Sequence, residues 1–360
     1  MTSDAPKALS QLGQSLWLDN ITRDLLDSGT LKRYIDELSV TGLTSNPTIF
    51  DHAISQSSHY DTEIRRQLDR GMTGESLFFN LAIQDLSRAA DLFAATHART
   101  GTVDGFVSLE VSPLLAYDTQ ATITQAKALH AKANKPNLFI KIPGTAEGLP
   151  AIEEAIYAGV PINVTLLFSA EQCTAAADAY LKGLERRVAA GLSPDVRSVA
   201  SLFVSRWDVA VAHKVPVELR NTLGIAVSRK CYKVYRDVRE SDRFQRLANV
   251  GARPQRLLFA STGTKDKSAS DTLYISGLAA PNTVNTMPEQ TLLAFADHGT
   301  TDSLLPRDSG DAAVTLQAHA KAGIDIVALA GQLQSEGAKG FVASWRDLLG
   351  AIDTKSKNLT

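Results

Sequence analysis

A single lysine interrupts the apolar segment "NLFIKIPGT" at residues 137–145. Leu, Phe and Ile flank Lys141, and proline and glycine bound the run, which is the pattern of a fully buried strand in a parallel sheet. Lysine is rarely buried, because an unpaired ammonium in an apolar environment is costly. A buried lysine that is neutral can attack a ketone carbonyl and form a Schiff base. Lys141 is therefore the candidate nucleophile.

Two carboxylates and one hydroxyl on other apolar segments are suited to move the protons that this chemistry requires. Glu110 in "SLEVSP" and Thr165 in "INVTLLF" can relay protons to a departing hydroxyl, and Asp19 in "SLWLDN" can take a proton from a substrate hydroxyl as a carbon–carbon bond breaks. A carboxylate near Lys141 favours the charged amine. Either desolvation outweighs Glu110, or Glu110 acts through a water, or it is protonated part of the time. These alternatives stay open.

The candidate residues occupy similar positions in their segments. Side chains alternate along a strand, so residues i and i+2 point to the same face. With the aliphatic residues turned toward surrounding helices, polar residues point inward. Most of them lie in the C-terminal half of their run, and those of the fifth and sixth runs lie nearer the middle. The inward polar residues with a candidate role are Asp19, Thr44, Asn46, Glu110, Lys141, Asn163, Thr165, Ser201 and Ser261.

Eight strand-like runs alternate with helical segments, one of which ends at Gly191, a typical helix stop. This α/β pattern predicts a single (β/α)8 TIM barrel with extra helices, whose active site lies at the C-terminal ends of the strands. An open doubly wound sheet is the alternative, although no GxGxxG follows the first strand. The expected strands are 15–19, 41–47, 105–113, 138–144, 160–169, 198–206, 255–262 and, less clearly, 271–278.

No linker or internal repeat divides the chain, so we expect one barrel domain over residues 1–360, with 1–14 and 354–360 as peripheral tails. The connection at 48–104 carries more than one helix, and 207–250 forms a charged helical insert. Each inward polar residue also has an ordinary explanation, such as a helix cap or a lysine that extends to solvent. Together these explanations require seven coincidences, one on each of seven strand-like runs, at one end of the barrel, which favours a site.

Composition restricts the remaining classes. The 360 residues are 44% hydrophobic with a net charge of −2, and Lys and Arg are spread along the chain, so neither nucleic acid nor a membrane is expected as the main partner. The N-terminal segment lacks the features of a signal or transit peptide. Two distant cysteines, Cys173 and Cys231, and scattered histidines predict no disulfide framework and no metal site, and they fit a cytoplasmic protein.

Cationic residues follow two of the late strands. Arg206 comes directly after "SLFVS", and "ASTGTK" places Ser261 and Lys265 at the end of the seventh strand and in the loop after it. Loops after the last strands of such barrels often bind phosphate, and an arginine fork suits phosphate oxygens. "STGTK" alone is also compatible with an ordinary flexible loop, because it lacks the spacing of a Walker A motif.

Six motifs together resemble the transaldolase family, in the order in which that family has them: "LTSNPTIF", "SLEVSPLLAYDT", "LFIKIPGTAEG", "INVTLLFS", "SLFVSRWD" and "LLFASTGTK". The resemblance covers roughly residues 15–290, and the closing stretch is similar to the longer bacterial type. It implies a (β/α)8 barrel without cofactor or metal that transfers a dihydroxyacetone unit from a ketose phosphate to an aldose phosphate, so that sugar phosphates are the expected partners.

By position, the resemblance assigns roles to single residues. Lys141 matches the Schiff-base lysine, Asp19 the acid/base for carbon–carbon cleavage, and Glu110 with Thr165 the pair that activates water. The resemblance further implies hydroxyl-binding residues at Asn46, Asn163 and Ser201, and phosphate ligands at Arg206 and Ser261.

One position departs from the family pattern. Many transaldolases carry an arginine two residues after the serine that matches Ser261, where this chain has Gly263. Lys265 is the nearest cation and is the candidate substitute, as a point charge without the bidentate geometry of arginine. Two other functions compete with transfer: a fructose 6-phosphate aldolase that uses the same lysine but releases dihydroxyacetone, and a catalytically silent barrel that acts as a binding protein. The sequence leaves monomer and homodimer both open.

Overall fold

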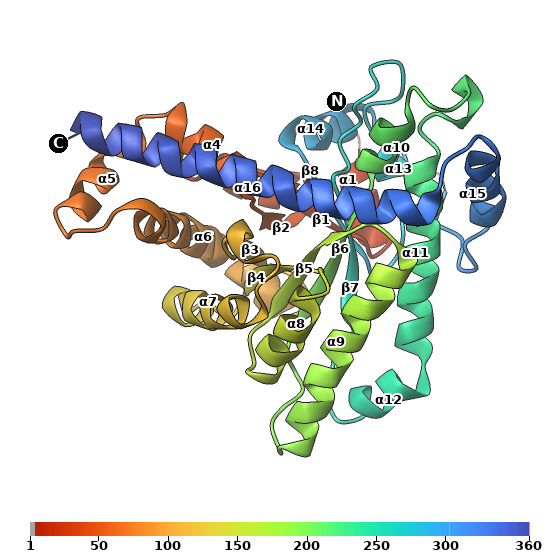
Figure 1. Cartoon of the computed structure of the whole chain (residues 1–360), viewed down its shortest axis with the longest axis horizontal. Helices are drawn as coiled ribbons and strands as arrows, with labels where there is room; N and C mark the ends of the chain where they lie inside the picture. The colour runs from red at the N-terminus through yellow and green to blue at the C-terminus, as the bar shows by residue number, and fades with distance from the viewer. Residues whose placement is uncertain (1–3, 302, 360) are drawn as a thin grey trace.

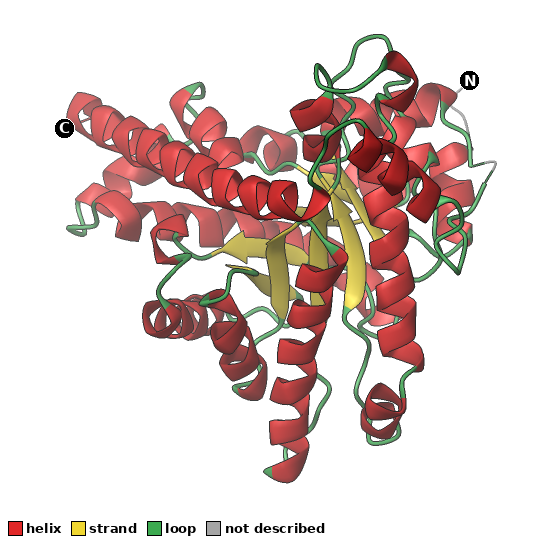
Figure 2. Ribbon diagram, turned by 45° about the vertical axis from the view of Figure 1, so that its right-hand side comes forward, coloured by secondary structure: helices red, strands yellow, loops and turns green. Residues whose placement is uncertain are grey.

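Eight parallel strands close into a barrel at the centre of the molecule. The computed structural model describes residues 4–301 and 303–359. The strands follow one another around the barrel in chain order, and the eighth pairs with the first, which confirms the predicted (β/α)8 fold (Figures 1 and 2). The strands are β1 (Ser15–Asp19), β2 (Val40–Thr44), β3 (Val107–Glu110), β4 (Leu138–Pro143), β5 (Ile162–Leu167), β6 (Ser198–Phe203), β7 (Arg256–Ala260) and β8 (Val284–Met287).

Helices connect the strands and surround the barrel (Figure 2). Several begin at a polar cap that directly follows a strand: the Asn46 side chain accepts a hydrogen bond from Ile49 N, and the Ser169 side chain accepts one from Gln172 N. The helices are α1 (Ala5–Gln11), α2 (Arg23–Asp27), α3 (Thr30–Glu37), α4 (Pro47–Ser55), α5 (Asp61–Leu68), α6 (Gly74–Arg99), η1 (Pro113–Leu115), α7 (Thr119–Ala133), α8 (Gly148–Tyr157), α9 (Ala170–Ala189), α10 (Ser205–Val211), η2 (Val217–Leu219), α11 (Leu223–Glu240), α12 (Asp242–Ala248), α13 (Leu273–Ser276), α14 (Glu289–His298), α15 (Ala312–Lys321) and α16 (Ile326–Leu359).

Seven of the eight expected strands coincide with β1 to β7 to within a few residues, but the eighth was predicted in the wrong place. Residues 271–278 contain the short helix α13, whose apolar Tyr274 and Ile275 are both buried. The true eighth strand, β8, reads "VNTM" and carries polar residues at its centre. A search for apolar runs misses β8 because Asn285 and Thr286 are polar. Asn285 turns away from the barrel axis and donates a hydrogen bond to Tyr274 O, so its burial is compensated.

Large aromatic side chains fill the interior of the barrel beneath the C-terminal end. The rings of Phe106 and Phe139 stack at 4.1 Å, and Trp17 packs against Phe139 at 6.1 Å between centroids. Gly42 on β2 makes space for this cluster, since an added Cβ would lie 2.6 Å from Trp17 Cε2 and 2.7 Å from Phe106 O. The close approach therefore requires glycine at this position.

The described ends of the chain are both helical and pack onto neighbouring elements. Helix α1 lies beside β1 and α14 and buries Leu9 completely. Residues 354–359 continue the long helix α16, which runs across one end of the barrel over α4 and α5 (Figure 1). The N-terminal residues 1–3 and residue 360 lie outside the described part of the chain.

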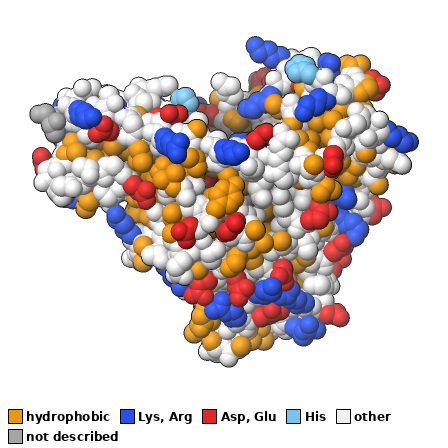
Figure 3. Space-filling view, viewed as in Figure 1, with side chains coloured by type: hydrophobic (Ala, Val, Ile, Leu, Met, Phe, Trp, Pro, Cys, Tyr) orange, Lys and Arg blue, Asp and Glu red, His pale blue; other side chains and the backbone are white. Residues whose placement is uncertain are grey.

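The insert at 207–250 is helical, as expected, and folds back onto α9. Arg243 on α12 forms ion pairs with Glu185 at 2.6 Å and with Asp178 at 2.7 Å, both on α9. On the face seen in Figure 3, acidic and basic side chains are intermixed over most of the surface. Within the described part of the chain, no helix has both the length and the apolar character needed to cross a bilayer.

Candidate active site

A cavity of about 260 Å3 opens at the C-terminal ends of the strands. Eight of the candidate residues line it, although they come from β1, β2, β4, β5, β6, β7 and the segments that follow them. The barrel topology thus gathers side chains that are distant in sequence. The candidate residues in the lining are Asp19, Thr44, Asn46, Lys141, Thr165, Ser201, Arg206 and Ser261.

Lys141 is buried at the cavity, with 5% of its surface exposed. Its Nζ lies 3.2 Å from Glu110 Oε2 and donates a hydrogen bond of 3.2 Å to Ser45 O. The same nitrogen lies 5.8 Å from the centroid of the Phe341 ring, which comes from α16. The amine is therefore held in place by one carboxylate, one carbonyl and one aromatic face, at the wall of the cavity that a substrate would occupy.

Glu110 does not itself line the cavity and reaches it through Lys141. Burial raises the pKa of its carboxyl group, the positive charge of Lys141 lowers it, and the net direction is upward. Apart from the contact with Lys141, its oxygens have no hydrogen-bond partner among the described residues. Glu110 can therefore accept the proton that the amine must lose to become nucleophilic.

Thr165 lines the same cavity as Lys141, and its Oγ1 is buried without a hydrogen-bond partner among the described residues. Buried hydroxyls are ordinarily satisfied, so an unpaired one at the wall of a polar cavity is suited to a substrate oxygen or a reacting water. The next residue, Leu166, has φ +59°, a left-handed conformation that is unusual for a branched side chain. Backbone strain is thus located directly beside Thr165.

Asp19 lies at the end of β1 and accepts a hydrogen bond of 2.7 Å from Thr44 Oγ1. Thr44 is paired in turn with Thr286 of β8, at 2.8 Å between the two hydroxyl oxygens. Burial raises the pKa of Asp19, against the lowering effects of the Thr44 hydrogen bond and of the charges on Lys141 and Lys265. The two carboxylates therefore have different partners, which is the condition for different proton-transfer roles.

The two candidate asparagines occupy different positions. Asn163 is completely buried behind the cavity, where it accepts a hydrogen bond of 2.7 Å from Ser201 and donates one of 3.1 Å to Ser108. Asn46 lines the cavity and also caps α4 through its Oδ1. Asn46 is thus a helix cap and a cavity residue at once. The cap uses the oxygen of its amide, and the nitrogen has no hydrogen-bond partner among the described residues.

Arg206 and Ser261 lie together at the rim of the cavity. Ser205 N donates a hydrogen bond of 3.0 Å to Ser261 O, and the two serine hydroxyls lie 3.0 Å apart, so the start of α10 is fixed to the end of β7. The Arg206 guanidinium packs 5.2 Å from the centroid of the Phe203 ring. Ser261 has φ +55°, a second left-handed residue at the site. This arrangement presents one cation and one hydroxyl to an anion at the rim.

Lys265 lies outside the cavity lining, exposed on the loop after β7. Its charge nevertheless lowers the pKa of Asp19, so its positive field extends into the site. The neighbouring Gly263 is closely packed, because an added Cβ would lie 3.1 Å from Pro288 Cγ. A larger side chain at position 263 would press on the loop that follows β8, which gives a local reason for the glycine there.

The cavity also contains residues that the sequence did not indicate as candidates. Thr286 belongs to the strand that was predicted in the wrong place, and Phe341 lies on α16, far from every motif. Phe203 follows the inward Ser201 by two residues, so strand alternation alone would have placed it in the site. No local signal marks Phe341, because its position depends on how α16 crosses the barrel.

Helix α16 contacts the site through its buried face. Gln334 Nε2 donates hydrogen bonds of 3.0 Å to Gly144 O on one side and to Leu166 O on the other, and so connects the ends of β4 and β5. Gly337, one turn further along, lies close to Leu166 and to Arg206. The helix thus holds in place the strand ends that carry Lys141 and Thr165.

Comparison with known proteins gives consistent matches over the whole barrel. Residues 16–352 match the family model described as transaldolase/fructose-6-phosphate aldolase. A transaldolase of an Arthrobacter species is 45% identical over 357 residues, which cover 96% of this chain and 95% of that protein. Transaldolase 2 of Streptomyces coelicolor is 42% identical over 366 residues, covering 99% and 98% of the two chains, and the transaldolase of Thermobifida fusca is 44% identical over 353 residues, covering 96% of each.

Proposed function

The chain belongs to the transaldolase/fructose-6-phosphate aldolase family, and we propose that it acts as a transaldolase in which Lys141 forms the Schiff base. The observation that carries the assignment is the position of the amine, which is buried beside a cavity and lies 3.2 Å from Glu110. The substrates are sugar phosphates: a ketose phosphate such as sedoheptulose 7-phosphate or fructose 6-phosphate donates a dihydroxyacetone unit, and glyceraldehyde 3-phosphate or erythrose 4-phosphate accepts it.

The first half of the reaction forms the covalent intermediate. Lys141 transfers a proton to Glu110 and attacks the ketone carbonyl as a neutral amine. Glu110 and Thr165, acting through a water, return protons to the departing hydroxyl, so that the carbinolamine loses water and becomes an iminium. The raised pKa of Glu110 supports this role, because a carboxyl that binds a proton readily can also deliver one.

The second half breaks and remakes a carbon–carbon bond. Asp19 removes the proton from the substrate hydroxyl next to the bond that breaks, the electron pair moves into the iminium, and an aldose phosphate departs. The enamine of dihydroxyacetone stays on Lys141 until an acceptor aldehyde binds. Asp19 then returns its proton to the new alkoxide, and water releases the product ketose.

The remaining polar residues bind the substrate. Asn46, Ser201 and Thr44 are proposed to hydrogen-bond the sugar hydroxyls, and the buried Asn163 is proposed to orient Ser201, from which it accepts a hydrogen bond. Arg206 and Ser261 are proposed to bind the phosphate at the rim, with Lys265 as an additional positive charge. All of these residues come from one chain, so a monomer and a homodimer would carry equally complete sites. A cytoplasmic enzyme fits this assignment, because both cysteines are free thiols.

Borohydride trapping with fructose 6-phosphate tests the nucleophile. Reduction should leave a stable adduct on Lys141, located by mass mapping of the peptides. Lys141→Ala should yield no adduct and no turnover, and its thermal unfolding midpoint should fall, because the truncation leaves Glu110 buried without its ionic partner. Adduct formation on another lysine, or an active Lys141→Ala enzyme, would refute the mechanism.

A second measurement separates transfer from simple aldol cleavage. With fructose 6-phosphate alone, we expect release of dihydroxyacetone to be much slower than formation of sedoheptulose 7-phosphate once erythrose 4-phosphate is added. Equal rates with and without the acceptor would indicate a fructose 6-phosphate aldolase instead. Absence of both reactions in a folded protein would indicate a binding protein.

A further inference from the structure

A second cavity, of about 400 Å3, lies at the opposite end of the barrel from the proposed active site. Its walls come from the beginnings of the strands: Ser15 starts β1, Ser198 starts β6 and Arg256 starts β7. In barrels of this class the N-terminal end ordinarily serves stability. A cavity there that is larger than the catalytic one requires an explanation from its chemistry.

The lining of this cavity is strongly cationic. Five arginines contribute to it, from the end of α6, the segments before β6 and β7, α11, and β7 itself. Among the lining residues that the structure describes, Asp104 is the one carboxylate, although the whole chain has a net charge of −2. The arginines are Arg99, Arg197, Arg239, Arg253 and Arg256.

Nearby carboxylates compensate only part of this charge. Asp195 forms an ion pair with Arg197 at 3.0 Å. Asp104 is engaged by uncharged donors, since it accepts hydrogen bonds from Ser15 Oγ and from Trp17 Nε1. Within residues 4–301 and 303–359, the other four arginines form no ion pair: Arg99, Arg239, Arg253 and Arg256.

Arg256 is built into the floor of the cavity. It is 8% exposed, and its Nη2 donates hydrogen bonds of 2.7 Å to Ser15 Oγ and 2.8 Å to Thr283 O. Ser15 also donates a hydrogen bond to Asp104 and so connects this carboxylate to the Arg256 guanidinium. The negative charge of Asp104 is therefore counted against Arg256. A buried guanidinium held by neutral acceptors keeps its positive charge, and it adds to the field of the cavity.

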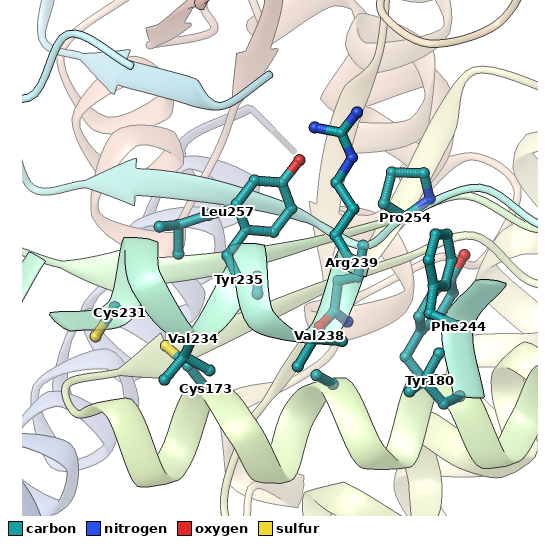
Figure 4. A pocket seen from close by; sticks show the side chains of 14 residues that line it. Cys173, Tyr180, Cys231, Val234, Tyr235, Val238, Arg239, Phe244, Pro254 and Leu257 are labelled. Atoms are coloured by element: carbon teal, nitrogen blue, oxygen red, sulfur yellow. The ribbon is translucent and has the colours of Figure 1, made fainter. Parts of the chain in front are cut away.

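Arg239 and Arg253 are more exposed than Arg256 and can reach a ligand from the solvent side. Figure 4 shows Arg239 and Tyr235 projecting from α11 in the same direction; both also line the small apolar crevice that contains Cys173 and Cys231. Arg197 and Arg253 line the same cavity; burial lowers the pKa of Arg197, and the charge of Arg253 lowers it further against the opposing effect of Asp195. Like charges that converge without a counter-charge are unfavourable, unless a bound anion lies between them.

We propose that this cavity is a binding site for a small anion that carries more than one phosphate group. Even after Asp104 and Asp195 are counted against the five arginines, three positive charges remain. A single phosphate ester carries a charge of about −1.5 to −2 at neutral pH and would leave part of this unmatched. Two phosphate groups match it, and guanidinium forks bind them with paired hydrogen bonds.

Isothermal titration calorimetry with inorganic pyrophosphate and tripolyphosphate tests the proposal. The wild-type enzyme should bind both polyanions, and inorganic phosphate at least about tenfold more weakly, because it matches less of the charge. ATP in a parallel titration shows whether a nucleoside is accepted as well. In Arg239→Ala/Arg253→Ala, which keeps Arg256 in the floor, binding should weaken at least about tenfold while sugar-phosphate turnover without polyanion is unchanged.

Two matched variants distinguish this cavity from other cationic surfaces. Arg206→Ala removes the cation at the proposed active site, and Arg246→Ala removes an exposed arginine of α12 that does not line the cavity. Both should bind pyrophosphate as the wild type does. The proposal is overturned if wild-type enzyme binds no polyanion, if the double variant binds as tightly as wild type, or if Arg206→Ala alone abolishes binding.

Discussion

Lys141 and Glu110 form a buried pair whose stabilising effect on the fold is small. Removing two charges from water costs several kcal/mol, and their mutual attraction returns this only when further hydrogen bonds satisfy both groups. Here Lys141 has one additional acceptor, Ser45 O, and Glu110 has no further partner among the described residues. Reactivity accounts for such a pair better than stability does, because the proton can be shared between the amine and the carboxylate.

The pH dependence of turnover should depend on Lys265. In its proposed role Asp19 must be ionised to accept a proton, and the positive charge of Lys265 opposes the rise in the pKa of Asp19 that burial causes. Lys265→Ala should therefore raise that pKa and move the acid limb of the kcat–pH profile to higher pH. The loss of one positive charge near the proposed phosphate site should also raise KM by roughly fivefold. Steady-state rates measured across the acid range check both effects.

Lys267→Ala provides the control for this prediction. Lys267 is an exposed lysine on the same loop, two residues further along, and its charge is not among the causes that shift the pKa of Asp19. Its variant should keep the acid limb and KM of the wild type. A limb that moves to lower pH in Lys265→Ala, or an equal shift in both variants, would contradict the proposed influence on Asp19.

At the scale of elements, α16 is the component that the barrel pattern alone does not include. It crosses the end of the barrel, contributes Phe341 to the cavity, and holds the ends of β4 and β5 through Gln334 (Figure 1). Its close approach is possible because Gly337 has no side chain. An added Cβ would lie 2.9 Å from Leu166 Cδ2 and 3.2 Å from Arg206 Nη1.

Gly337→Ala should impair substrate binding and slightly lower stability. The new methyl group displaces Arg206 and Leu166, so KM for the sugar phosphate should rise roughly tenfold, which corresponds to about 1.4 kcal/mol. Crowding costs about 1–3 kcal/mol, and the better helix propensity of alanine returns about 1 kcal/mol. Kinetics and urea unfolding measure the two effects separately.

Gly340→Ala is the matched control on the same helix, because no heavy atom lies within 4 Å of the position that an added Cβ would occupy. We expect this variant to gain about 0.5–1 kcal/mol in the free energy of unfolding, with unchanged KM. Gly337→Ala could instead behave as Gly340→Ala should, with higher stability and unchanged KM. In that case the contact of α16 with Arg206 would have no role in substrate binding.

At the scale of the whole molecule, the barrel separates two polar ends by an aromatic interior. Trp17, Phe106 and Phe139 lie between the proposed active site and the arginine-lined cavity, and Phe106 and Phe139 also contribute to the walls of the latter. Closure of the barrel around this cluster depends on Gly42. A single methyl group there affects the packing of several strands, because Trp17 and the backbone of Phe106 already occupy the space that it would need.

Gly42→Ala should therefore destabilise the whole barrel by about 1–3 kcal/mol, through overlap with Trp17 and with Phe106 O. Urea unfolding followed by tryptophan fluorescence measures the loss. Gly350→Ala, at an open position of α16, should leave stability equal or slightly higher. A Gly42→Ala protein as stable as the wild type would show that the strands move apart at little cost.

The amino-acid pattern was sufficient to predict the barrel class, seven strands and the set of inward polar residues. Strand alternation fixes which side chains point inward, and parallel strands in a closed barrel end at the same face, so Asp19, Lys141 and Thr165 had to meet. The amino-acid pattern did not locate β8, because this strand is polar at its centre. Its inward Thr286 and outward Asn285 have hydrogen-bond partners that only the folded chain brings close.

Only the tertiary structure shows which residues the packing of distant elements brings to the active site and to the second cavity. Phe341 and Gln334 reach the site because α16 crosses the barrel, and no local pattern encodes where a helix docks. Burial raises the pKa of Glu110 and the nearby Lys141 lowers it. Both effects depend on the folded structure, so the sequence left the protonation of Glu110 open. The five arginines of the second cavity are spread from residue 99 to residue 256, and they form one positive field only when the strand beginnings converge.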